Sequence, residues 1–119
     1  MKQIATILSE KDTFMLKVDA HRLFSKEDAT DKREQLLNIV LDSIKHVAET
    51  ESGYLLKFGT DQEDMVLISD WLLTEKICNP FLRFTLHVES NNGPISVELS
   101  GPAGTKDFLE STLSLKRWL

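Results

Sequence analysis

Residues 82–89 and 94–99 carry the pattern that most constrains the fold of this chain. Apolar and polar side chains alternate in both segments, LRFTLHVE and PISVEL, as in strands with one buried face and one polar face. The Asn92-Gly93 dipeptide between them suits a type I′ turn, in which both central residues have positive φ. We therefore predict an antiparallel hairpin in a sheet that is covered on one side only.

A second hairpin is expected earlier, in HVAETESGYLLKFG. The polar residues 50–53 read as its turn. Beyond the turn, Tyr54 and Leu56 project to one side of a strand, while Leu55 and Lys57 project to the other. This segment repeats the one-sided pattern of the first hairpin.

Helices are expected before the early hairpin and after the late one. The first begins near Ser25, a hydroxyl N-cap followed by acidic residues that the helix dipole favours. The last begins at Gly101-Pro102, with proline in the first helical position. Apolar stripes support both: Leu37, Val40, Leu41 and Ile44 in the first, and Phe108, Leu109, Leu113 and Trp118 in the last.

The helix between the hairpins is predicted to run from Asp61 to about Cys78. Thr60 and Glu63 have the spacing of a capping box, and Asn79-Pro80 ends the helix because proline cannot continue its hydrogen bonds. Its apolar residues cover a wide arc, which predicts burial on more than one side: Met65, Leu67, Ile68, Trp71 and Leu72.

The expected order is α-β-β-α-β-β-α, preceded in residues 1–24 by either a further hairpin or a frayed, partner-dependent segment. A β-β-α unit thus occurs twice, at 44–78 and 81–116. Hairpins with helices segregated to one face predict a single α+β domain over residues 1–119. We expect a two-layer sandwich, with an antiparallel sheet of at least four strands.

Composition narrows the functional classes. A net charge of -5 and a pI near 5.1 disfavour nucleic acid as a partner, because phosphate binding needs clustered Lys and Arg. No apolar run approaches the roughly 20 residues of a membrane span, and the first residues lack a signal-peptide core. A single cysteine excludes an intramolecular disulfide. These features together predict a cytoplasmic protein.

The single cysteine, Cys78, is the first candidate for chemistry. A reactive thiol is usually activated by a helix N-terminus or a nearby cation. Cys78 is expected at a helix C-terminus, where the dipole opposes the thiolate, so we expect it to pack as a small apolar residue. The three histidines and the cysteine form no pair with metal-ligand spacing. We therefore predict no metal site, no cofactor and no catalytic residue.

The polar face of the late hairpin is a candidate binding surface. On this face we expect a mixed-charge surface that can receive a ligand, a protein partner or a second copy of the chain. An ordinary solvated sheet face is the alternative interpretation. The surface would consist of Arg83, Thr85, His87, Glu89, Ser96 and Glu98.

A series of short motifs spans the second half of the chain: GYLLKF at 53–58, CNPFLRFTL at 78–86, NGP at 92–94 and GPAGTKDFL at 101–109. Together with Glu75, they resemble a family of small, mostly uncharacterised bacterial proteins. In that family a Glu-x-x-Cys-Cys-Pro-Phe motif ends the helix. The resemblance implies the same α+β fold and no established activity. Here Asn79 replaces the second cysteine, so a vicinal dithiol cannot form.

The leading hypothesis is a binding or interaction module that associates with itself or with another protein, with Glu75, Cys78, Arg83 and His87 as candidate site residues. The rival hypothesis is a thiol- or metal-dependent sensor or enzyme centred on Cys78. A third is a small-ligand pocket between helices and sheet, lined by Trp71, Phe81, Phe84 and Phe108.

Overall fold

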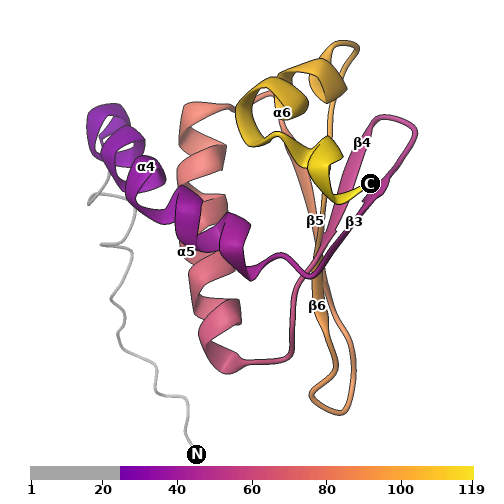
Figure 1. Ribbon diagram of the computed structural model, residues 1–119. Helices are drawn as coiled ribbons and strands as arrows, with labels where there is room; N and C mark the ends of the chain where they lie inside the picture. Colours follow the sequence, from indigo (N-terminus) through magenta and orange to yellow (C-terminus); the bar gives the residue numbers. More distant parts are fainter. Residues whose placement is uncertain (1–24) are drawn as a thin grey trace, which may run out of the picture.

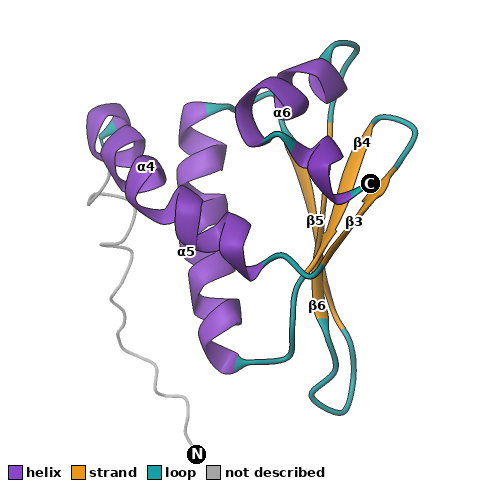
Figure 2. Ribbon diagram, in the orientation of Figure 1, coloured by secondary structure: helices purple, strands orange, loops and turns teal. Residues whose placement is uncertain are grey.

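A computed structural model describes residues 25–119, and the segment expected to be a hairpin or frayed end, residues 1–24, lies outside them. Three α-helices cover one side of a four-stranded antiparallel sheet (Figure 1), and the two layers separate clearly in Figure 2. This is the α+β sandwich that the sequence predicts. The elements are α4 (Lys26–Ser43), β3 (His46–Glu49), β4 (Gly53–Lys57), α5 (Gln62–Cys78), β5 (Arg83–Val88), β6 (Ile95–Ser100), α6 (Thr105–Leu113) and the 3-10 helix η1 (Leu115–Trp118).

The sheet has the strand order β3-β4-β6-β5, and every neighbouring pair is antiparallel. Each β-β-α unit supplies an edge strand first, β3 or β5, and an inner strand second, β4 or β6. The two units join at the centre of the sheet, where Leu56 lies opposite Val97. The repeated unit expected from the sequence is therefore present in the arrangement of the strands.

The core lies between the sheet and the helices. Burial alternates along β6, as the sequence pattern predicts, with the odd-numbered residues from Ile95 to Leu99 buried. In Figure 1, α4 crosses α5, and both helices lie on the same side of the sheet. Fully enclosed side chains come from every layer: Val40, Val47, Tyr54, Leu56, Ile68, Trp71, Val97, Leu99, Leu109, Leu113 and Leu115.

Helix α4 begins where the sequence predicts. Ser25 is the N-cap, and its side chain accepts a hydrogen bond from the Asp28 amide while the Asp28 carboxylate accepts one from the Ser25 amide. Such reciprocal capping satisfies two otherwise unpaired backbone donors. The buried stripe contains Leu36 beside Val40, whereas the predicted Leu37 is only partly buried.

The start of α5 differs from the prediction. Asp61 is the N-cap, the helix begins at Gln62, and no side chain caps it. The capping box expected from Thr60 and Glu63 is wrong, because with Asp61 as the N-cap the box position falls on Asp64. The end of the helix is as expected, with Asn79 as the C-cap.

The turn of the β5–β6 hairpin is shifted by one residue from the prediction. Asn91 and Asn92 have positive φ values of 59° and 58°, and the Gly93 amide donates to the Ser90 carbonyl at 3.1 Å. Asparagine tolerates this left-handed region better than most residues. Gly93 is instead needed for space, since a Cβ there would lie 2.7 Å from the Glu89 Cβ.

Helix α6 begins later than Gly101-Pro102. The GPAG segment is a turn in which the Thr105 amide and hydroxyl both donate to the Pro102 carbonyl, at 3.1 and 2.7 Å. Gly104 is the N-cap, with a positive φ of 95° that favours glycine. The helix ends at Leu113, so Trp118 belongs to η1. Within residues 25–119, no helix is both long and apolar enough to span a bilayer.

Candidate functional site

The four candidate residues from the sequence lie in two separate places. Glu75 and Cys78 lie on the last turn of α5, whereas Arg83 and His87 lie on β5. On β5 they alternate with Phe84 and Leu86, so they face the outer side of the sheet, away from the helices. Among residues 25–119, no hydrogen bond or ion pair joins the two groups.

Glu75 is a buried carboxylate, 2% exposed, whose two oxygens are both occupied by neighbours. Oε2 accepts from Arg33 Nε at 2.8 Å and from Trp71 Nε1 at 2.9 Å, and Oε1 accepts from Asn79 Nδ2 at 2.7 Å. Buried charges are tolerated when they are paired and hydrogen-bonded in this way. The contacts tie α4 to the C-terminal end of α5, and they leave no carboxylate oxygen directed at a substrate.

Cys78 packs at the α4–α5 contact and is partly buried. Its Sγ lies 3.7 Å from the Thr30 hydroxyl, at the C-terminal end of α5. In the described part of the chain, no group of three His, Cys, Asp or Glu side chains is placed to hold a metal ion. The geometry around Cys78 is that of a packed side chain.

The mixed-charge face expected on the hairpin is present on the outer side of the sheet. Arg83 lies opposite Ser100, Thr85 opposite Glu98 and His87 opposite Ser96. All three β5 side chains are exposed. A hollow of about 170 Å³ borders the face at Glu89 and Ser96, beside Lys57.

The other side of β5 holds the feature that the sequence pattern did not reveal. Phe84, Leu86 and Val88 point to the helix side, as predicted, but Leu86 is 40% and Val88 57% exposed. A hollow of about 150 Å³ lies between Met65 of α5 and Val88. We call these four side chains, Met65, Phe84, Leu86 and Val88, the β5 edge surface.

Among residues 25–119, the backbone of β5 also has no partner on its outer edge. The Glu89 amide donates to the Pro94 carbonyl at 3.2 Å, whereas the Ile95 carbonyl accepts from the Phe58 amide on the β4 side. Residues of an antiparallel strand bond alternately to one neighbour and to the other. The N–H and C=O groups of Phe84, Leu86 and Val88 therefore point away from β6, where residues 25–119 supply no further strand.

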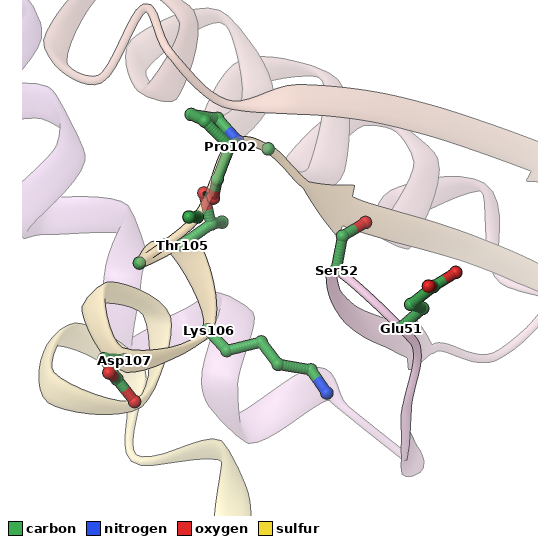
Figure 3. Close-up of a pocket in the computed structure, with 9 residues that line it drawn as sticks. Glu51, Ser52, Pro102, Thr105, Lys106 and Asp107 are labelled. Carbon is green, nitrogen blue, oxygen red and sulfur yellow. Dashed lines mark hydrogen bonds between the residues drawn. The ribbon is translucent and has the colours of Figure 1, made fainter.

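Two other regions of residues 25–119, a hollow beside α6 and a group of aromatic side chains, lack free groups for binding. Figure 3 shows a hollow of about 290 Å³ beside the start of α6, bordered by Glu51 and Ser52. Its lysine, Lys106, is held by Glu49 at 2.8 Å, so no free cation faces the hollow from α6. The hypothesis of a small-ligand pocket lined by aromatic residues also gains no support. Trp71 is fully buried, and its N–H donates to the Glu75 carboxylate.

No protein-family model, no curated protein and no solved structure matches the chain. The resemblance to small bacterial proteins therefore stays a prediction.

Proposed function

We propose that the protein is a small binding module that adds an extended strand of another polypeptide to its sheet at β5. The observation that carries the proposal is that Phe84, Leu86 and Val88, with exposed apolar side chains beside them, have no backbone partner on the free edge within the described part of the chain. In strand addition, the main chain supplies hydrogen bonds and alternate side chains supply specificity. The β5 edge surface offers both.

The sequence of β5 supports this use of the edge. Proteins usually protect an exposed edge strand with proline, inward-pointing charge, a bulge or a very short strand. β5 has six residues, RFTLHV, in continuous register with β6. It contains no proline, and its one arginine, Arg83, lies on the outer face. An unprotected edge of this length favours a partner strand.

The candidate residues then have different roles. Arg83 and His87 flank the edge on the polar side, where they can select a partner by charge. Glu75 and Cys78 hold α5 against α4 and contribute to the scaffold behind the edge. The rival thiol or metal chemistry gains no support, because both Glu75 oxygens are already bound within the chain.

A photo-reactive phenylalanine analogue at position 86 tests the proposal. Ile39 on α4 is the matched control site, because it is also apolar and is 53% exposed. We expect position 86 to give a discrete cross-linked polypeptide, either a second copy or another protein, and position 39 to give none. Equal cross-linking at the two positions would refute the proposal.

A second variant tests whether strand pairing causes the cross-link. Val88→Pro removes an N–H that points to the free edge, so the fold tolerates it while an incoming strand loses a hydrogen bond. We expect the cross-link at position 86 to fall at least several-fold in Val88→Pro with the circular-dichroism spectrum unchanged. A cross-link of undiminished yield would contradict strand addition.

A further inference from the structure

Resting on the proposed function, we infer that the incoming strand is β5 of a second copy of the chain. The two β5 strands would run antiparallel about a two-fold axis at Leu86, and the two sheets would become one. The inference is drawn from the direction of the β5 backbone groups, from the charges at the two ends of the strand and from the exposed apolar face.

The backbone limits where the axis can lie. Only Phe84, Leu86 and Val88 present N–H and C=O groups to the free edge, so these residues must lie opposite one another. An axis at Thr85, Leu86 or His87 satisfies this condition. An axis between two residues does not satisfy it. Such an axis would place a residue whose backbone groups point to the free edge opposite one whose backbone groups point to β6, and the helix side of one copy would continue into the outer side of the other.

Charge then selects one of the three positions. An axis at Leu86 places Arg83 opposite Glu89 of the second copy, and the symmetry forms this pair twice. An axis at Thr85 would instead place Arg83 opposite His87, which offers the guanidinium no carboxylate. An axis at His87 would place Arg83 opposite Asn91, in the turn beyond the end of the strand. Opposite charges directly across a strand pair stabilise it, and like charges destabilise it.

The apolar side chains fit the same register. With the axis at Leu86, Phe84 lies opposite Val88 of the second copy, and the two Leu86 side chains meet. All of them lie on the helix side, because a two-fold axis perpendicular to the sheet keeps each face on its own side. The second copy would thus cover the Leu86 and Val88 surface that is 40% and 57% exposed in the single chain. The polar face continues on the outer side, with Thr85 opposite His87.

Single cysteines at the three candidate positions test the register. Thr85→Cys, Leu86→Cys and His87→Cys are made in a Cys78→Ala background and oxidised with copper-phenanthroline. A cysteine on the axis meets its own copy within disulfide reach, whereas one displaced by a residue does not. We expect Leu86→Cys to form the covalent dimer at least several-fold faster than the other two. Faster cross-linking at Thr85→Cys or His87→Cys would overturn the register.

Light scattering of the unmodified chain separates failure of this inference from failure of the proposed function. We expect a mass that rises to that of two copies with concentration. A single-copy mass at all concentrations overturns the inference. In that case the proposed function still stands if the analogue at position 86 cross-links a different protein and Val88→Pro lowers the yield of that product. It falls if no such product forms.

Charge exchange provides an independent test of the Arg83–Glu89 pairing. Arg83→Glu and Glu89→Arg should each weaken dimerisation by roughly tenfold, because each places two like-charge pairs across the axis. An equimolar mixture of the two variants should restore the dimer, since both cross-strand pairs in the mixed species are again opposite in charge. Failure of the mixture to associate better than either variant alone would contradict the pairing.

Discussion

The two edges of the sheet, β3 and β5, have the same place in the fold but different surroundings. Each is the first strand of a β-β-α unit and lies outside its inner partner. β3 has four residues, its Val47 is 1% exposed, and η1 contacts it. β5 has six residues, and its Leu86 and Val88 are 40% and 57% exposed. The same unit therefore yields one edge strand whose helix-facing side chains are covered, the closed edge, and one whose helix-facing side chains are exposed, the open edge.

The two edge strands differ in exposure because different segments follow the two β-β-α units. Past α6, the chain turns at Ser114, which has a positive φ of 55°, and η1 returns to β3. An ion pair between Glu49 and Lys106 links the end of β3 to α6. On the other side, α5 is fixed against α4 by Glu75, and it borders the hollow beside Val88 with Gln62 and Met65 from its first turn. Closure of an edge thus depends on the added C-terminal segment, which β5 lacks within residues 25–119.

The largest expected effect comes from placing the same charge on both edges. Val47→Asp buries a carboxylate in the core and should lower the free energy of unfolding by about 3 kcal/mol or more. Leu86→Asp adds the charge at an exposed site and should cost less than about 1 kcal/mol in the monomer. Urea unfolding at low protein concentration measures both. Equal losses would show that the two edges do not differ as described.

The second prediction concerns Glu75, whose hydrogen bonds hold α5 against α4. Glu75→Ala leaves the Arg33 guanidinium, the Trp71 N–H and the Asn79 amide without their acceptor, and should cost about 3 kcal/mol. Glu75→Gln retains an acceptor and should cost less. Chemical unfolding of the two variants gives the order, and a Glu75→Gln loss as large as that of Glu75→Ala would contradict this role.

The smallest effect is expected at the closed edge, from the exposed pair of Glu49 and Lys106. The hydrogen bond and charge of Lys106 lower the pKa of the Glu49 carboxyl below 4.5. Because the folded chain then binds this proton less readily than the unfolded chain, the pair stabilises the fold above about pH 4.5. The stabilisation disappears as the pH falls through the lowered folded pKa.

Lys106→Met tests this pH dependence. The variant should be slightly less stable than the unmodified chain at pH 7, and the difference should shrink as the pH falls to about 3. Thermal unfolding across this range measures it. A difference that stays constant with pH would show that the carboxylate charge of Glu49 is not involved.

The sequence predicted which way the β5 side chains point but not whether anything covers them. Alternation reports the face of a strand, and it placed Phe84, Leu86 and Val88 correctly on the helix side. The exposure of these side chains depends on strand order and on where helices distant in sequence pack. The periodicity of the sequence carries no information about either. The start of α6 was missed for a different, local reason: the GPAG segment has helix-start residues, but it forms a turn in which Thr105 donates to the Pro102 carbonyl, so the helix begins only at Thr105.

The buried Glu75 shows how much of a site local spacing can reveal. Trp71 and Asn79 precede and follow it by one helical turn, so all three lie on one face. A carboxylate in an apolar stretch of helix, with the donors of Trp71 and Asn79 one turn away on each side, is therefore a pattern that predicts a buried hydrogen-bond acceptor. The third partner, Arg33, comes from α4, and no spacing in the sequence identifies it.

Amide hydrogen exchange along β5, followed by NMR as the protein concentration is raised, tests the central claim most directly. The amides of Thr85 and His87 bond to β6 and should be protected at every concentration. Those of Phe84, Leu86 and Val88 should exchange rapidly in the dilute protein and become protected as the second β5 strand adds. If these three amides still exchange rapidly at the highest concentration, β5 is not the edge at which two copies join.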